Sequence, residues 1–349
     1  MQVLIQGVGG IGGVIAARLL AAGARPTLVT GNPAIAAALH QRGIGLDEHG
    51  ETRWIPLAIP ATAEVPPDDG PYDAILLVTQ STTMEAALRA SKDRLAPHGV
   101  VVCLQNGLPE ARAAALVGAE RVVGGVVSWG ASMVEPGRYR QTSAGRLQLG
   151  RPNGPPDAVV ERLAAFLAPV GKVRTTDNLP GVRWSKLALN SAITTLGAVG
   201  GERLGEIVRH HYVRRLALEV FTELVTVAHR LGIDLAHISG TFSLESVALP
   251  RHADGSPLGL RDLWWRHAVL LAVGMKYRRV RSSMLYALER GRPPEVDYLN
   301  GEIVRHAEAL GLQAPVNRRL MELVHSIAAG ERKSSMELLR QAHAELIRA

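Results

Sequence analysis

A glycine-rich turn near residue 1 is the feature that most constrains how this chain can fold. The segment Gly7-Val8-Gly9-Gly10-Ile11-Gly12 fits G-x-G-x-x-G and lies between a short apolar run, Val3–Ile5, and a run of small apolar residues, Gly10–Ala22. Between a strand and a helix, such glycines allow a tight turn, close approach of a pyrophosphate and close helix–strand packing. The helix N-terminus adds N–H groups and partial positive charge. This context favours dinucleotide binding over a purely structural turn, with cofactor contacts predicted from Gly7, Gly9, Gly10, Ile11 and Gly12.

Strand-like and helix-like segments alternate through the first half of the chain. Strands are predicted at Val3–Ile5, Thr27–Thr30, Asp73–Thr79 and Val100–Leu104, and helices at Gly10–Ala22, Pro33–His40 and Met84–Leu95. This alternation predicts βαβ units and a parallel sheet that is buried on both faces. Further short strands, antiparallel in part, are expected to close the domain at Val122–Val127, Arg138–Gln141 and Arg146–Leu149.

The second half of the chain has helical periodicity almost throughout. Helices are predicted at Trp184–Leu196, Tyr212–Leu231, a run ending near Glu289, Pro294–Leu310 and Asn317–Ala328, and one long loop at Pro250–Leu260. A chain of 349 residues also suggests two domains, at ~150 residues per domain. We therefore expect a Rossmann-type α/β domain over residues 1–177 and an all-α domain over residues 178–349.

Composition excludes several classes of protein. Apolar residues are 47% and charged residues 20% of the chain, which is ordinary for a globular protein. No apolar run reaches the ~18 residues of a membrane span, and the N-terminus has no signal-peptide pattern. Cys103 is the only cysteine, which excludes an internal disulfide and a thiolate metal cluster. We expect a cytoplasmic protein without a metal centre or a membrane association.

The net charge of +7 raises the question of nucleic-acid binding. The arginines are scattered and aromatic residues are only 4%, so the sequence does not predict a nucleic-acid partner. The densest cluster of basic residues, at residues 276–281, is explained by a solvated helix face or by a positively charged surface near an anionic substrate.

The end of the second strand bears on which dinucleotide binds. An acid that binds the ribose of NAD is expected ~20 residues beyond the glycines, but Val29-Thr30-Gly31-Asn32 has none. Without a carboxylate to repel it, a 2′-phosphate could be held by Thr30, Asn32 and nearby amides. The sequence thus favours NADPH and leaves NAD open.

A polar stripe marks the first helix of the second half. Lys186, Asn190 and Thr194 follow each other at i, i+4 and i+8 and so share one face among apolar neighbours. The stripe is explained either by a surface lysine with a capping asparagine or by a partly buried lysine whose pKa is lowered toward an acid/base range. Periodicity alone does not decide between these interpretations.

A second candidate segment runs from Arg281-Ser282-Ser283-Met284-Leu285 to Glu295-Val296-Asp297-Tyr298-Leu299-Asn300-Gly301. Gly291 is expected to end one helix, and Pro294 to lie in the first turn of the next. Glu295 and Asp297 would then be favourable charges at a helix N-terminus, which is a sufficient structural explanation for both.

Together these segments resemble the ketopantoate reductase (2-dehydropantoate 2-reductase) family over essentially the whole chain. The resemblance rests on the glycine turn, the Leu104-Gln105-Asn106-Gly107 turn, the helix of Lys186 and Asn190, and the SSML…EVDYLNG segment. It implies a Rossmann domain and a helical domain similar to the C-terminal domain of 6-phosphogluconate dehydrogenase, with NADPH and a 2-oxo acid in the cleft between them. It also implies the reduction of ketopantoate to pantoate, a step toward pantothenate and coenzyme A, by a homodimer.

The resemblance also implies roles for individual residues. Lys186 would be the general acid and Glu295 would bind the substrate hydroxyl and organise the site. The substrate would be held by Asn106, Asn190, Thr194 and Ser283, and Asn106 would also contact the nicotinamide. Such a lysine is chemically suited to the role, because an ammonium both stabilises a developing alkoxide and donates the proton that a reduced ketone needs.

The sequence differs from the family pattern at three positions. Family members usually carry an arginine where Gly31 stands, a lysine where Gln80 stands, and a second asparagine where Thr194 stands. The first two differences leave the choice between NADPH and NADH open, although Gln80 keeps its place among the expected cofactor contacts. The third leaves open another, branched or bulkier 2-oxo acid. A catalytically silent dinucleotide-binding protein is the alternative from a different class, but Lys186 and Glu295 argue against it.

Overall fold

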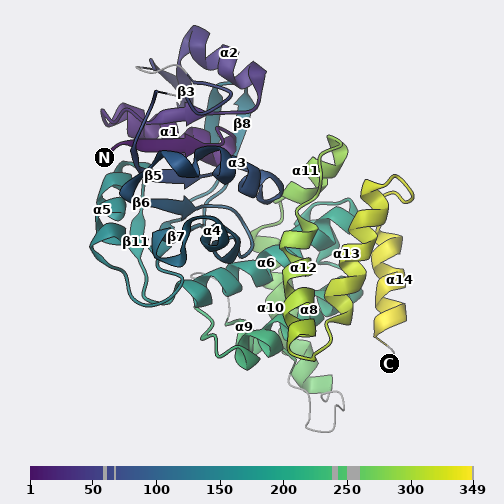
Figure 1. Cartoon of the computed structure of the whole chain (residues 1–349). Helices are drawn as coiled ribbons and strands as arrows, with labels where there is room; N and C mark the ends of the chain where they lie inside the picture. Colours follow the sequence, from purple (N-terminus) through teal and green to yellow (C-terminus); the bar gives the residue numbers. More distant parts are fainter. Residues whose placement is uncertain (58–60, 67, 238–242, 250–259, 348–349) are drawn as a thin grey trace. The chain divides into compact units, whose positions relative to one another are not determined.

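The computed structural model describes residues 1–57, 61–66, 68–237, 243–249 and 260–347. The chain divides into two compact units, Met1–Leu179 and Pro180–Ala349. Within these described residues, the first unit contains all the strands, and from α6 onward the chain is helical (Figure 1). The expected α/β domain and helical domain are thereby confirmed. All but the last residue of the loop expected at Pro250–Leu260 lies outside the described residues.

The first unit is built on a seven-stranded sheet in the order β11-β10-β7-β6-β5-β1-β2. The strands are β1 (Val3–Gln6), β2 (Thr27–Val29), β5 (Tyr72–Leu77), β6 (Leu95–Cys103), β7 (Val122–Val127), β10 (Leu147–Gly150) and β11 (Val173–Thr175). β2, β1, β5, β6 and β7 are parallel, and β10 is antiparallel to β7. The strand order reverses beside β1, so the carboxyl ends of β1, β2 and β5 meet at the position where doubly wound sheets bind ligands.

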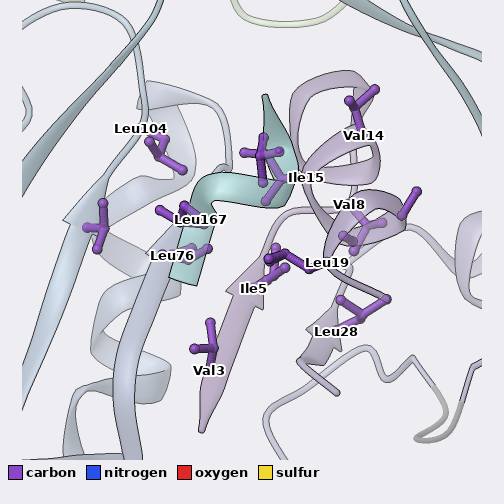
Figure 2. Packing of buried hydrophobic residues seen from close by; sticks show 14 of the residues in the cluster. Val3, Ile5, Val8, Val14, Ile15, Leu19, Leu28, Leu76, Leu104 and Leu167 are labelled. Carbon is purple, nitrogen blue, oxygen red and sulfur yellow. The ribbon is translucent and has the colours of Figure 1, made fainter. Parts of the chain in front are cut away.

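Both faces of this sheet are buried, as the continuous apolar strands predict. Val3 and Ile5 of β1 belong to one core cluster and Leu4 to the other. The first cluster includes residues of α1 (Gly10–Ala21) and α5 (Ala158–Leu167), and Figure 2 shows Ile5 close to Leu19 of α1. The second includes residues of α3 (Met84–Ser91) and α4 (Glu110–Val117). The period-two alternation of each strand therefore divides its side chains between two helical layers.

A second, four-stranded sheet was not predicted from the sequence. Its order is β4-β3-β9-β8, with β3 (Ile44–Glu48), β4 (Glu51–Ile55), β8 (Ala131–Glu135) and β9 (Arg138–Gln141). The strand expected at Arg138–Gln141 exists, but it pairs with β3 and β8 instead of closing the main sheet. β3 follows α2 (Pro33–Arg42), and β8 and β9 pack on α1.

The helical unit contains α6 (Leu179–Gly200), α7 (Leu204–Ile207), α8 (His211–Arg230), α9 (Leu244–Val247), α10 (Leu260–Lys276), α11 (Ser283–Glu289), α12 (Asn300–Ala309), α13 (Pro315–Ala328) and α14 (Met336–Leu346). Gly291 has a φ of 63° and follows α11, as expected for a helix stop. α14 was not predicted from the sequence, and one predicted helix begins at a different residue.

That helix begins at Asn300 and not at Pro294. A single 3₁₀ turn, η5 (Val296–Tyr298), precedes it, and Leu299 between them has non-helical angles, φ −118° and ψ −92°. The interpretation of Glu295 and Asp297 as charges in the first turn of a helix that starts at Pro294 is therefore wrong. Asp297 instead contacts His325 of α13, with 2.8 Å between Oδ1 and Nε2.

Candidate functional site

The predicted phosphate-binding turn follows β1 directly. Gly7 has a φ of 101°, and its N–H donates to the carbonyl of Val29 at the end of β2 (2.9 Å). A Cβ atom on Gly7 would lie 2.7 Å from the Thr79 nitrogen, and one on Gly12 would collide with the Gly7 carbonyl oxygen. Both positions therefore require glycine, the first for backbone conformation and close approach and the second for helix–strand packing.

Gly9 differs from these two because nothing occupies the space beside it. A Cβ atom there would meet no heavy atom within 4 Å, while one on Gly10 would lie 2.8 Å from the carbonyl oxygen of Ala131 in β8. Gly9 is the N-cap of α1, which has no side-chain cap and no acid in its first turn. The first N–H groups of α1 therefore face no acidic side chain of that turn, and Gly9 leaves room for a phosphate to reach them. Ile11, also expected to contact the cofactor, packs partly against the core.

Tyr139 of β9 supports this turn, a role that no local sequence pattern predicts. Its side chain is fully buried (0% exposed), and its hydroxyl donates to the carbonyl of Val8 inside the turn (2.8 Å). Gly13 lies against the tyrosine ring so closely that a Cβ atom there would overlap it. A sequence pattern could not reveal this contact, because it joins residues 131 positions apart.

We expect Tyr139→Phe to weaken cofactor binding without unfolding the protein. The variant leaves the Val8 carbonyl without its donor, which costs about 1–3 kcal/mol when the group is buried. If the turn loosens, the Kd for NADPH should rise by about 3- to 10-fold, a loss of ~1 kcal/mol or slightly more. Titration calorimetry beside thermal unfolding checks this. A lower Tm with an unchanged Kd would restrict Tyr139 to a role in stability.

The residues expected around a 2′-phosphate lie after β2. Thr30 is buried, and its N–H donates to Thr62 (2.9 Å). Asn32 caps α2, because its Oδ1 accepts from the Ala34 N–H (3.0 Å). That bond uses the side-chain oxygen of Asn32, which leaves its NH₂ group as the donor to an anion. Gly31 is exposed, and a Cβ atom there would meet nothing within 4 Å.

Hydrogen bonds join the turn after β5 to the turn after β6. Gln105 Nε2 donates to Thr79 Oγ1 (3.4 Å), and the Ser81 hydroxyl donates to the carbonyl of Asn106 (3.2 Å). Gly107 then turns the chain with a φ of 79°. Gln80 is exposed beside these residues. Asn106, Gln80 and the glycine turn thus all follow the carboxyl ends of adjacent parallel strands, which is the expected edge for a cofactor.

The polar stripe of the helical unit lies on α6. Lys186, Asn190 and Thr194 are partly buried, whereas Leu187 and Ala188 are fully buried. Thr194 donates its hydroxyl to the carbonyl of Asn190 (2.6 Å). Its hydroxyl hydrogen is therefore engaged by its own helix, and only its lone pairs remain for another donor.

Lys186 has the electrostatic environment of an acid/base group. Burial, and secondarily the Arg183 guanidinium one turn away, lower the pKa of Lys186 to about 7. The Glu295 carboxylate acts in the opposite direction and raises that pKa. A lysine with a pKa near neutrality, placed close to a carboxylate, is suited to proton transfer.

The two serines that begin α11 have different surroundings. Ser282 is buried, donates to the carbonyl of Thr194 (2.6 Å) and accepts from the Leu285 N–H (3.1 Å) as the N-cap of α11. A Cβ atom on Gly197 would lie 2.9 Å from Cβ of Ser282, so the two elements approach closely. Ser283, the residue expected to hold substrate, is exposed at the start of α11. Its role stays a prediction.

The described residues contain neither a candidate metal site nor a candidate membrane span. No three His, Cys, Asp or Glu side chains among them are grouped so that they could hold a metal ion. In the same part of the chain, every helix is too short or too polar to cross a membrane.

Comparisons with known proteins match this architecture along nearly the whole chain. The family model described as "Ketopantoate reductase PanE/ApbA" matches residues 3–154, and the model of its C-terminal domain matches residues 178–328. The 2-dehydropantoate 2-reductase of Pyrococcus horikoshii is 29% identical over 325 residues, which cover 93% of this chain and 96% of that protein. Both the N-terminal and the C-terminal part of the chain thus match models of the same family.

Solved structures agree. A PanE/ApbA family ketopantoate reductase from Ralstonia eutropha JMP134 has a TM-score of 0.77 at 28% identity, covering 95% of this chain and 99% of that one. D-mandelate dehydrogenase, solved with NADH and anilino(oxo)acetate, has a TM-score of 0.78 at 21% identity with the same coverage, and so shares the fold. The chain belongs to the ketopantoate reductase family and is a nicotinamide-dependent oxidoreductase.

Proposed function

We propose that this protein reduces a 2-oxo acid with NADPH, and that the substrate is ketopantoate, which becomes pantoate. The observation that carries the proposal is Lys186, a partly buried lysine. Burial and Arg183 lower its pKa to about 7, and the Glu295 carboxylate acts in the opposite direction. Family membership supports the substrate, because relatives that match over more than nine-tenths of this chain are named 2-dehydropantoate 2-reductase.

The residues of the first unit fit a dinucleotide. The open side of Gly9 and the N-terminus of α1 would hold the pyrophosphate. Thr30, the NH₂ group of Asn32 and Gln80 would lie near the 2′-phosphate, and Asn106 near the nicotinamide. The bound nicotinamide would supply the hydride that reduces the carbonyl carbon.

The helical unit would supply the proton and the side chains that bind the substrate. The Lys186 ammonium donates a proton to the carbonyl oxygen, and its charge stabilises that oxygen while negative charge develops. Glu295 favours the ammonium form and accepts a hydrogen bond from the substrate hydroxyl. Asn190 and Ser283 would donate hydrogen bonds to the carboxylate without adding a competing acid, and Thr194, whose hydroxyl hydrogen is engaged by its own helix, would contact the substrate without donating to it. The homodimer and the cytoplasmic location expected from the sequence stay predictions.

Another, branched or bulkier 2-oxo acid is the second candidate, and one observation favours a substrate other than ketopantoate. Thr194 stands where the family usually has an asparagine, and its hydroxyl donates to Asn190 within the helix. The site therefore has one polar donor fewer for the ketopantoate hydroxyl than the family pattern supplies.

A panel of 2-oxo acids assayed with NADPH and with NADH tests the proposal. Ketopantoate should give the highest kcat/KM, and the preference for NADPH should stay below about 1,000-fold, because charged contacts contribute ~1.5–3 kcal/mol each and no arginine or lysine stands at Gly31 or Gln80. Gly31→Arg, for which the backbone has space, should increase that preference. Turnover of none of the acids would reject the proposal and favour a silent dinucleotide-binding protein. A stronger parental preference for NADPH would mean that other residues bind the 2′-phosphate.

A further inference from the structure

A buried chain of polar side chains joins α6 to three other helices of the second unit. Thr195 of α6 donates its hydroxyl to Asn300 Oδ1 (2.5 Å), and Asn300 Nδ2 donates to Asn317 Oδ1 (2.8 Å). Asn317 Nδ2 donates in turn to Oε2 of Glu223 on α8 (2.7 Å). The first three residues are 0% exposed and Glu223 is 4% exposed. Buried networks of this kind are costly unless every member is satisfied, and they then fix one arrangement.

Glu223 determines which group donates and which accepts in each hydrogen bond of this buried network. Its carboxylate accepts from the Val316 N–H (2.8 Å), the Asn317 N–H (3.0 Å) and the Asn317 side chain. Burial raises the pKa of Glu223 to about 7. Because the ionised carboxylate can only accept, the NH₂ group of Asn317 faces Glu223 and its oxygen faces Asn300. The oxygen of Asn300 is then left to accept from Thr195. Neither amide can rotate by 180° without losing bonds to its neighbours.

Asn300 is the member that connects the two segments of the candidate site. It binds α6 at two points, since its Nδ2 also donates to the carbonyl of Ser191 (3.2 Å), and Ser191 follows Asn190 directly. Asn300 is also the first residue of α12, and only η5 and Leu299 separate it from Glu295. A displacement at Asn300 would therefore move Glu295 relative to α6.

We infer that Asn300 is a positioning residue, which holds the segment of Glu295 against α6 so that the Glu295 carboxylate stays close to the Lys186 ammonium. The inference rests on the proposed function, because it concerns the placement of the two residues that would carry the reaction. Among the residues that the structure describes, the charged groups that act on Lys186 are Arg183, on α6 itself, and Glu295. If this link loosens, Glu295 no longer opposes burial and Arg183, and the pKa of Lys186 should fall further.

Thr195→Val tests this inference, because valine keeps the shape of threonine but leaves Asn300 Oδ1 without its donor. Thr195→Ser restores the hydroxyl and should rescue the activity. Thr222→Val is the matched control. Thr222 is also a buried threonine (4% exposed), but its hydroxyl accepts from the Leu249 N–H (2.8 Å) and has no bond to Asn300.

For Thr195→Val we expect kcat to fall on the order of 10- to 100-fold, as displacements of about 1 Å do. The Kd for NADPH should stay unchanged, and the midpoint of the kcat–pH profile should shift to lower pH. Thr195→Ser and Thr222→Val should resemble the parent in all three, even if Tm falls. Equal losses in Thr195→Val and Thr222→Val, or a parental kcat and midpoint in Thr195→Val, would overturn the inference. If Thr195→Val does not fold, Thr195→Cys, with its weaker S–H donor, takes its place.

A second readout needs no substrate. Competitive labelling of the full chain with acetic anhydride, followed by mass spectrometry across pH, reports the pKa of Lys186 directly. The pKa should be lower in Thr195→Val than in the parent and in Thr222→Val. If this difference holds while the parent reduces no 2-oxo acid, the proposed function fails and the positioning role stands. If the parent is active and the pKa does not move, the positioning role alone fails.

Discussion

Replacing Lys186 with alanine should lower kcat on the order of 100- to 10,000-fold, the range expected for loss of a general acid. The Kd for NADPH should change little, because the ammonium acts on the substrate oxygen as charge develops and not on the cofactor. Steady-state kinetics and cofactor titration on the same preparation measure both. Lys333→Ala is the matched control, because Lys333 is an exposed lysine of the same unit and its removal should leave both values unchanged.

Glu295 provides an internal check on this result. Glu295→Ala should lower kcat and raise the substrate KM, since its proposed role combines binding the hydroxyl and favouring the ammonium form of Lys186. The two losses should be less than additive in the double variant, because both residues act on one reacting group. Near-normal turnover by Lys186→Ala would show that Lys186 is not the acid.

Gly9→Val should abolish cofactor binding while the protein stays folded. A Cβ atom at Gly9 meets nothing within 4 Å, so the fold has room for the side chain, which would fill the space assigned to the pyrophosphate. Titration with NADPH should show no saturable binding, and thermal unfolding should give a Tm close to that of the parent.

Gly31→Ala serves as the control for this variant. A side chain at Gly31 also meets nothing within 4 Å, but it stands at the end of β2 and not beside the α1 N-terminus. It should keep measurable NADPH binding. A folded Gly9→Val protein that binds NADPH as tightly as the parent would mean that the pyrophosphate does not lie on this turn.

Local patterns predicted the parts of the fold whose cause is local. The first strand, turn and helix follow from the glycine spacing, and the long helix of Lys186 from apolar periodicity. The second sheet lacked such a signal. β3 pairs with the adjacent β4, but most side chains of β4 are exposed or half-buried. The other neighbour of β3 is β9, at residues 138–141, which lies far along the chain. The role of Tyr139 depends on that pairing, so it was equally inaccessible.

The candidate site shows the same division. The spacing of Lys186 and Asn190 placed both on one helix face, but the lowered pKa of Lys186 depends on burial and on neighbours that periodicity does not specify. Ser282 and Ser283 are adjacent, and only the start of α11 decides which of them contacts α6. The role of Asn300 could not be predicted, because it depends on α12 beginning at Asn300, whereas Pro294 indicated an earlier start of the helix.

The kcat for ketopantoate reduction across pH, measured for the parent and Lys186→Ala together, tests the central claim most directly. Only the ammonium form donates a proton, so the parental kcat should be highest below the pKa of Lys186, about 7, and should fall as pH rises through it. The residual rate of Lys186→Ala should lack this decline. A parental kcat that stays flat from about pH 6 to about pH 9 with chemistry rate-limiting, or the same decline in Lys186→Ala, would contradict proton donation by Lys186.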